Sequence, residues 1–279
     1  MLKSYKWKKT MRDAGSYLVR LLVGLLIMFP IIMGFSYSLR SDAEIMTSTL
    51  TLFPKHFTWE NYVWVLKYVP VARYMLNSII CCAIVIGSQA LICSMAAYAF
   101  SFFDFKGKKL LFMMILMTTM IPGDVTLIAN YLRIQKWGLI NTFAGMTLPF
   151  LVSGMGIFMM RQFYLSLPKD IKESATLDGC GDIGFFIRIA IPLSVPSLAA
   201  LAIYEFIMIY NQYLWPLLIS SSQNMYTIQI GMAMLKGAET DHLGVILAGA
   251  MICIAPAILV FVAGQKYIIR GMISGGIKG

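Results

Sequence analysis

The stretch MLNSIICCAIVIGSQALICSMAAYAF, residues 75–100, contains no charged side chain. A helix needs about 20 mostly apolar residues to cross the hydrocarbon layer of a membrane. Backbone polar groups in lipid have to be satisfied within the segment, so a run of this kind is expected to be helical. The stretch therefore predicts a membrane-spanning helix.

Five further segments have the length and composition of a span. Only a few charges interrupt them, namely Arg20 in the first, Asp124 near the end of the third and Glu205 in the fifth. Strands of a membrane barrel would instead be short segments of alternating hydrophobicity. The sequence predicts an all-α polytopic membrane protein with six helices, at residues 17–39, 75–100, 110–128, 143–160, 189–219 and 243–264.

The composition supports this fold class. Of the 279 residues, 59% are hydrophobic and 13% are charged, whereas soluble domains have about 45–50% apolar and about 25% charged residues. These values exclude a soluble enzyme, a secreted disulfide scaffold and a disordered chain. None of the five cysteines lies in a loop predicted on the outer side, and no Cys/His spacing resembles a metal site. Neither a disulfide nor a bound metal is expected.

The distribution of positive charge predicts the orientation. With a cytoplasmic N-terminus, the inner segments hold 15 Lys and Arg residues and the outer segments hold 7, as the positive-inside rule requires. Both termini are therefore expected inside. The first apolar run is longer than the signal-peptide core of about 7–15 residues, so we expect it to be retained. The predicted regions are a basic N-terminus (1–16), a transmembrane domain (17–268) with an inner loop (161–192), and a C-terminal tail (269–279).

The inner loop and the four residues after it have the sequence RQFYLSLPKDIKESATLDGCGDIGFFIRIAIPLSVP, residues 161–196. Pro168 suits the first turn of a helix, and Asp170 and Glu173 suit its positive end. Gly179 is a natural helix stop, and residues 182–189 form a second amphipathic stretch. The sequence predicts two short surface helices with a glycine break between them, suited to a groove in another protein.

The same loop carries a family motif. Glu173-Ser174-Ala175, followed after three residues by Gly179, after nine more by Ile189, and then by Ile191-Pro192, resembles the EAA loop of ABC-importer permeases. The only departures from that pattern are Ser174 for Ala and Ile191 for Leu, which are mild.

Other segments extend the resemblance over nearly the whole chain. They are TWENY (58–62), IPGDVTLIANYLRIQKWGLINTFAGMTLP (121–149), YNQYLWPLL (210–218) and RGMISGGIKG (270–279). Together they are similar to the carbohydrate-uptake subfamily of maltose and glycerol-3-phosphate type. The tail and the lack of extra N-terminal helices favour the second permease of the pair.

The resemblance implies a set of partners. A homologous second permease would form a heterodimer with this chain, two copies of a cytoplasmic ABC ATPase would dock on the pair, and an extracellular or periplasmic binding protein would deliver the substrate. ATP and Mg would bind to the ATPase, because this chain has no phosphate-binding loop of its own. The implied location is the bacterial cytoplasmic membrane. The ATPase-coupling residues implied by the motif are Glu173, Ser174, Ala175, Asp178, Gly179, Ile189 and Pro192.

Polar residues within the predicted spans are candidates for the substrate path. Intramembrane acids are functional candidates by default. Instead of contacting substrate, Asp124 could cap a helix that begins after Pro122-Gly123, or face water. Glu205 could instead pair with the partner permease. Tyr213 and Trp215 suit an interfacial aromatic belt, whereas amides within a helix need partners. The predicted substrate-path residues are Glu205, Tyr210, Asn211, Gln212 and Asp124.

The substrate class and the transport mechanism each have a rival hypothesis. A phosphorylated substrate needs Arg or Lys in the cavity, and the spans contain almost none, which favours a neutral saccharide over glycerol 3-phosphate. A self-sufficient secondary transporter would have paired ionisable residues in matching halves, and only one deep acid is present. A membrane-embedded enzyme lacks a recognisable catalytic constellation, so the chain is not expected to be an enzyme.

Overall fold

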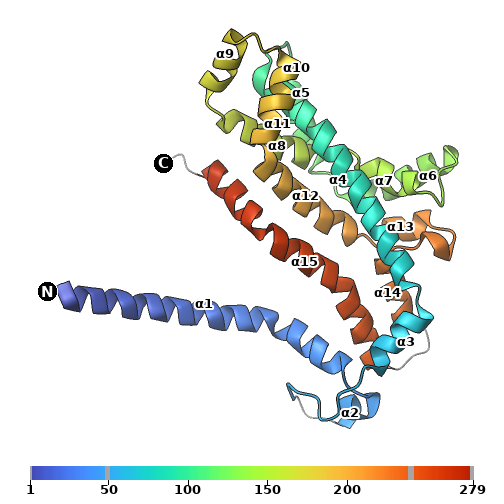
Figure 1. Ribbon diagram of the computed structural model, residues 1–279. Helices are drawn as coiled ribbons and strands as arrows, with labels where there is room; N and C mark the ends of the chain where they lie inside the picture. Colours follow the sequence, from blue (N-terminus) through green and yellow to red (C-terminus); the bar gives the residue numbers. More distant parts are fainter. Residues whose placement is uncertain (1, 48–50, 238–241, 277–279) are drawn as a thin grey trace. The chain divides into compact units, whose positions relative to one another are not determined.

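The computed structural model describes residues 2–47, 51–237 and 242–276 (Figure 1). Within these ranges every regular element is a helix. The described residues form two compact units. We name them after their first helices: the α1 unit contains described residues from 2–69 and 234–252, and the α4 unit contains those from 70–233 and 253–276.

The α1 unit begins with a long apolar helix. Its helices are α1 (Leu2–Ser38), α2 (Asp42–Thr47) and α3 (Glu60–Tyr68), together with the beginning of α15 (Leu243–Gly276). The part of α1 from Gly15 to Ser38 is long and apolar enough to cross a membrane, and its most apolar window has no buried residue. Side chains exposed in this way on an apolar helix are suited to lipid or to another membrane chain.

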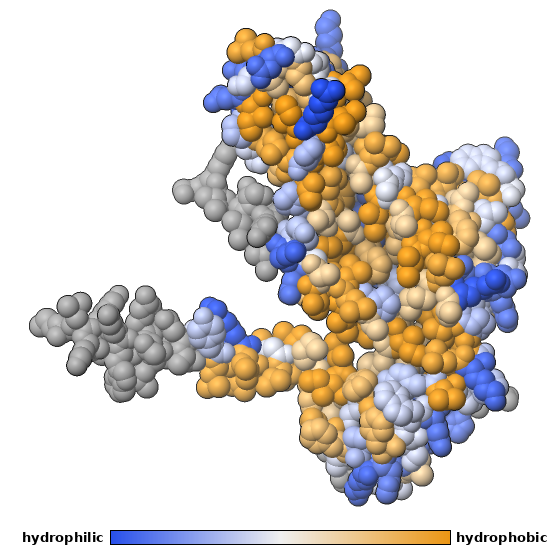
Figure 2. Space-filling model, in the orientation of Figure 1, coloured by the Kyte–Doolittle hydropathy of each residue, from blue (hydrophilic) through white to orange (hydrophobic). Residues whose placement is uncertain are grey.

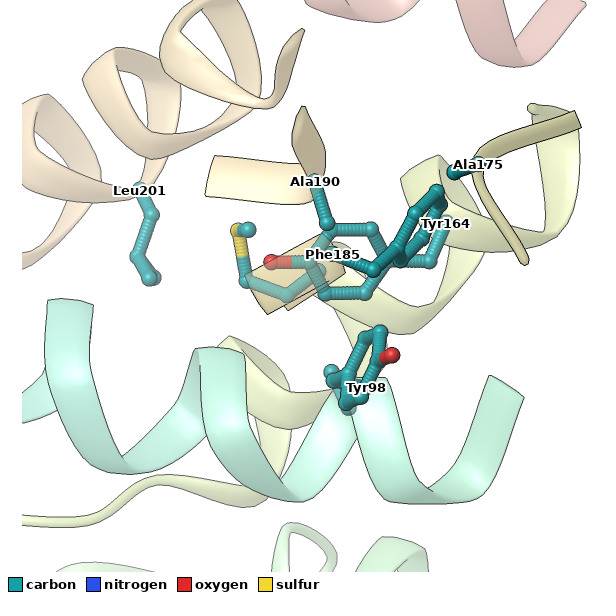
Figure 3. Close-up of a cluster of buried hydrophobic side chains, with 8 residues drawn as sticks. Tyr98, Tyr164, Ala175, Phe185, Ala190 and Leu201 are labelled. Atoms are coloured by element: carbon teal, nitrogen blue, oxygen red, sulfur yellow. The ribbon is translucent and has the colours of Figure 1, made fainter. Parts of the chain in front are cut away.

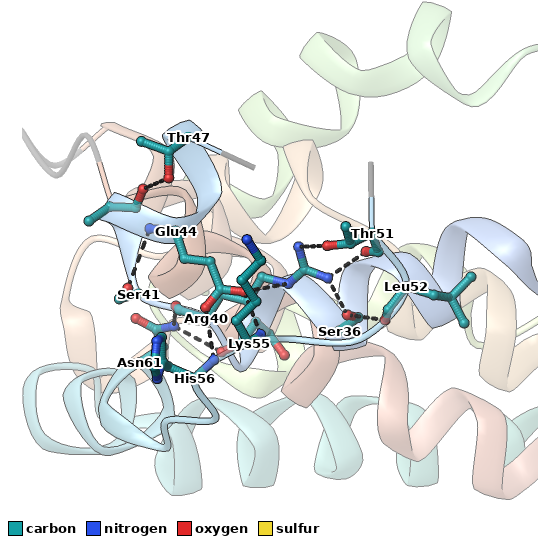
Figure 4. Close-up of polar contacts among 12 residues, drawn as sticks. Ser36, Arg40, Ser41, Glu44, Thr47, Thr51, Leu52, Lys55, His56 and Asn61 are labelled. Carbon is teal, nitrogen blue, oxygen red and sulfur yellow. Dashed lines mark hydrogen bonds and ion pairs between the residues drawn. The ribbon is translucent and has the colours of Figure 1, made fainter. Parts of the chain in front are cut away.

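A buried arginine organises the segment that follows α1 (Figure 4). The guanidinium of Arg40 donates hydrogen bonds to the hydroxyls of Ser36 and Thr51, both at 3.0 Å. The Asn61 amide in turn donates to the carbonyl of Arg40 at 2.8 Å. A buried charge needs such partners. These bonds fix the chain between α1 and α3, and the backbone N–H of Lys55 adds a 2.7 Å bond to the Glu44 carboxylate.

The α4 unit is built around α4 (Val71–Phe102), which packs against α8 (Gly154–Ser166) and α12 (Val195–Tyr210). The three helices run beside one another in Figure 1. Figure 2 shows hydrophobic side chains covering large parts of the visible surface, and Leu91, Met95 and Met113 are among the large exposed ones. Extended apolar surface of this kind marks contact with a membrane or with a partner.

Three predicted spans are bent pairs of helices. The first pair is α5 (Lys108–Thr118) with α6 (Gly123–Lys136), at 93°. The second is α7 and η1 (Phe143–Thr147, Leu148–Phe150) with α8, at 51°. The third is the segment Asp182–Leu193 with α12, at 70°. Counting each pair as one span, together with α1, α4 and α15, gives the six predicted spans within the described residues.

The bends have local causes that the hydropathy pattern hides. Pro122 precedes α6, and a proline has no N–H with which to continue a helix. Ser153 breaks the next pair, because its hydroxyl caps α8 by accepting the Gly156 N–H at 2.8 Å. The fifth predicted span also ends early, since α12 stops at Tyr210 and a separate helix α13 (Leu214–Ile219) follows.

Candidate functional site

The loop at residues 161–192 forms the two short helices that its sequence predicts. Helix α9 (Lys169–Leu177) begins directly after Pro168, and α10 (Asp182–Phe185) continues through a π-helical turn (Phe186–Ala190) into α11 (Ile191–Leu193). The break between them is a left-handed glycine stop, because Gly179 has φ +79°. The N–H groups of Cys180 and Gly179 return to the carbonyls of Ala175 and Thr176, at 2.9 and 3.0 Å. This pairing is the Schellman motif.

The inner face of this loop packs into the protein (Figure 3). Ala175 is 6% exposed and belongs to a buried cluster with Tyr98 of α4, Tyr164 of α8 and Phe185 of α10. Leu201 of α12 completes the contact with the spans. A small residue at position 175 lets α9 lie close to these aromatic rings. The loop is thereby in direct contact with the three central helices of the α4 unit.

The outer face of the loop is open. Glu173, Ser174, Asp178, Gly179 and Pro192 are exposed, and Ile189 is half-buried. Large apolar side chains accompany them, with Leu177 88% exposed and Ile183 77% exposed. Protruding apolar side chains beside an exposed carboxylate form a surface suited to a protein partner. Of the predicted coupling residues, only Ala175 is buried in the core.

A cavity of about 720 Å3 lies among α4, α5, α6, α8, α12 and α13. This volume is within the usual range of about 300–1,000 Å3 for small-molecule sites. Its polar lining side chains are Gln89, Thr118, Thr119, Asp124, Thr126, Asn130, Ser153, Tyr204, Glu205, Gln212, Tyr213 and Trp215. Two of these are acids, and none of the described lining residues is Lys, Arg or His. The cavity is therefore rich in groups that accept hydrogen bonds.

Glu205 lies on the α12 wall of the cavity and is 5% exposed. Ser153 donates a hydrogen bond of 3.2 Å to its carboxyl oxygen Oε1 while also capping α8. The serine therefore connects the N-terminus of one helix to an acid in the middle of another. The hydrogen bond from Ser153 gives this buried acid a polar partner.

The other predicted substrate-path residues divide into two groups. Asp124, in the first turn of α6, and Gln212, just after α12, line the same cavity as Glu205. Tyr210 is buried elsewhere, with its hydroxyl donating to the Cys253 carbonyl at 2.8 Å. Asn211 is exposed, and its side-chain oxygen accepts a 3.3 Å hydrogen bond from Gln229. The structure thus brings together three of the five residues.

Of the two aromatic residues for which the sequence favours an interfacial belt, Trp215 differs from that prediction, whereas Tyr213 is exposed. Trp215 is only 6% exposed, and its indole N–H donates to the Met146 carbonyl at 3.0 Å. An indole that is satisfied inside the protein is not part of a lipid-facing belt, and it lines the cavity together with Tyr213. Sequence reasoning missed Gln89 and Ser153 in this wall. The available signal was a polar side chain within an uncharged span.

The comparisons with known proteins agree with this architecture. Residues 89–274 match the family described as binding-protein-dependent transport system inner membrane component. The chain is 32% identical over 260 residues to the arabinooligosaccharides transport system permease protein AraQ of Halalkalibacterium halodurans, covering 92% of this chain and 93% of that protein. It is 31% identical over 265 residues to the sn-glycerol-3-phosphate transport system permease protein UgpE of Yersinia pestis, covering 91% and 94%.

A solved structure shows the same fold. It is the crystal structure of a bacterial ABC transporter involved in the import of the acidic polysaccharide alginate, and one of its chains aligns with a TM-score of 0.80. The alignment covers 92% of this chain and 96% of that chain, at 22% identity.

These relatives place the chain in the inner membrane as a multi-pass protein. They are transport permease subunits, and the family works with an ATPase and a binding protein. The family model covers most of the chain, and the relatives match it over more than nine-tenths of its length. The chain therefore belongs to the family of inner-membrane components of binding-protein-dependent transport systems.

Proposed function

We propose that this chain is the permease subunit of an ATP-driven importer of a neutral saccharide, working by alternating access. The chemistry of the cavity carries the proposal. Its wall combines the carboxyl groups of Asp124 and Glu205, the amides of Gln89 and Gln212, and the aromatic ring of Trp215. Hydroxyl groups of a sugar donate to carboxyl and amide oxygens, and the faces of its rings pack on aromatic side chains. Pockets for such ligands combine apolar walls with a few placed polar groups.

The charge of the cavity separates two substrate classes. The relatives named above include a permease for arabinooligosaccharides and one for sn-glycerol 3-phosphate, so similarity alone favours neither. Recognition of a phosphate calls for Arg or Lys, and the described lining residues include two acids and no base. This wall offers a phosphate no cationic partner among the described lining residues. We therefore propose a neutral saccharide as the substrate, with glycerol 3-phosphate as the alternative.

The proposed assembly has a second permease, two copies of a cytoplasmic ATPase and a binding protein outside the membrane. ATP and Mg would be held by the ATPase. Both termini of this chain would be cytoplasmic, which places the loop at 161–192 inside, as the excess of positive charge there supports. The exposed Glu173 and the protruding Leu177 and Ile183 would contact the ATPase.

The buried cluster beneath the loop supports a role in transmission. Ala175 contacts the core that Tyr98 of α4 and Leu201 of α12 share, and α4 and α12 also line the cavity through Gln89 and Glu205. A movement imposed on α9 would therefore reach both cavity walls. Packed interiors transmit displacement because they have few voids.

The test is uptake by cells that carry Glu173→Ala together with Gly179→Pro. Uptake of labelled neutral oligosaccharide should be lost, while the amount of chain in the membrane fraction stays normal. The matched control is Asp170→Ala with Gly181→Ala, which removes a charge and a glycine from the same loop and should leave uptake in place. Persistence of uptake in the Glu173 and Gly179 double variant would overturn the proposal.

A further inference from the structure

Lys172 of α9 occupies an aromatic site at the end of α4. Its ammonium nitrogen lies 5.7 Å from the ring centre of Tyr98, 5.1 Å from that of Phe102 and 5.0 Å from that of Phe103. It also lies 3.1 Å from the carboxylate oxygen Oδ1 of Asp182. A cation within about 6 Å of an aromatic ring is attracted to the face of that ring. We call these five residues the Lys172 clasp.

The clasp adds polar contacts among α9, α10 and α4, which also pack together through the cluster around Ala175. Lys172 lies before Gly179 in the sequence and Asp182 lies after it. Their ion pair therefore connects α9 to α10 across the break. The Tyr98 hydroxyl donates to the Asp182 carbonyl at 3.1 Å, which fastens the start of α10 to α4 as well. The side chain of Lys172 is 24% exposed. Partial removal from water strengthens both the ion pair and the cation–π contacts.

The helix that carries the aromatic residues also reaches the cavity. Gln89 lies nine residues before Tyr98 on α4, which corresponds to about 13.5 Å along a helix. The Gln89 amide donates to the Phe150 carbonyl at 2.9 Å, at the break before α8. One continuous helix therefore has the clasp near its end and a cavity wall in its middle.

We propose that Lys172 is the positioning residue that ties the loop at residues 161–192, here called the coupling loop, to α4, so that a movement of α9 is passed to the cavity wall. The inference rests on the proposed function, because it takes α9 to be the helix that the ATPase moves. The apolar cluster around Ala175 attaches the loop at residues 161–192 to α4, α8 and α12 together by packing. The clasp adds a charge-dependent attachment between the loop and α4.

The experiment uses the complete importer, purified with its partner chains and reconstituted in liposomes. It compares wild type with Lys172→Met, Lys172→Arg and Asp182→Asn. The readout is the number of oligosaccharide molecules transported per ATP hydrolysed, with the amount of bound ATPase measured in parallel. The control is Lys169→Met, which removes the same charge from an exposed position on the same helix.

Lys172→Met should lower the ratio of transport to ATP hydrolysis by roughly threefold to tenfold while the ATPase stays bound. Lys172→Arg keeps the cation and should restore most of the ratio, Asp182→Asn should lower it less, and Lys169→Met should leave it unchanged. Should the methionine variant fail to assemble, Tyr98→Phe keeps the ring, removes the bond to Asp182 and should lower the ratio in the same direction.

Three outcomes separate failure of this inference from failure of the proposed function. A wild-type ratio in Lys172→Met with the ATPase bound would overturn the clasp and leave the importer intact. Equal losses in Lys172→Met and Lys172→Arg would also overturn it, because the charge would then not matter. A wild-type chain that binds no ATPase would overturn the proposed function itself.

Discussion

Replacement of Gly179 tests whether the break in the coupling loop depends on backbone conformation alone. A Cβ atom at this position would meet nothing within 4 Å, yet the residue has φ +79°. An L residue in this left-handed region costs about 1–2 kcal/mol. Gly179→Ala should therefore reduce the population of the native break by a factor of about 5 to 30. Gly179→Asn should have a smaller effect, because asparagine tolerates this conformation.

The same loop provides a matched control. Gly181 also has open space around it, but its φ of −70° is accessible to any residue. Gly181→Ala should therefore leave the loop unchanged.

The assay is amide hydrogen exchange of the purified importer in lipid nanodiscs. The Cys180 N–H, which donates to the Ala175 carbonyl, should exchange about 5 to 30 times faster in Gly179→Ala, because local opening sets the rate of exchange. Equal exchange in Gly179→Ala and wild type would show that the break does not depend on the left-handed conformation of residue 179. So would an equal acceleration in Gly181→Ala.

Three further changes have expected outcomes elsewhere in the chain. Ser153→Ala removes the α8 cap and should destabilise the protein by about 1 kcal/mol, measured as a lower melting temperature in detergent together with slower uptake. Gly145→Ala would place a Cβ 2.2 Å from a backbone oxygen and should strongly reduce the folded yield, whereas Gly87→Ala, with nothing within 4 Å, should keep the yield of wild type. Hydrogen bonding from the backbone N–H of Lys55 lowers the pKa of Glu44 below its ordinary value of 4.5. The ionised carboxylate therefore stabilises the folded protein at pH values above 4.5, and this stabilisation is lost as the pH falls through the lowered pKa. Melting curves of Glu44→Gln and wild type should therefore differ at neutral pH and converge in acid.

Hydropathy was sufficient to predict the spans but not their breaks. Uncharged runs such as 75–100 are long enough that only a membrane helix satisfies their backbone groups, and α4 covers that run without interruption. The breaks depend on single residues whose effects are local. Pro122 and Ser153 each end a helix within an apolar segment, and the average hydropathy of the segment is unchanged by the bend.

The coupling loop was predictable in detail, and the cavity only in part. Pro168 and Gly179 act on their own backbone, so their consequences follow directly from sequence. The cavity instead depends on where each side chain points in three dimensions. Asn211 and Gln212 are neighbours of the same chemical type, yet only Gln212 lines the cavity, because α12 has just ended at Tyr210 and the chain turns there. Such a change of direction leaves no periodic signal.

The importer reading is tested most directly by uptake, with the importer purified from its native host and reconstituted in liposomes. Mass spectrometry would first identify the chains that purify with this one. We expect a second permease and an ATPase, and uptake of a neutral oligosaccharide that requires ATP and the binding protein and is not inhibited by sn-glycerol 3-phosphate. A chain that purifies alone and drives uptake from an ion gradient without ATP would contradict this expectation.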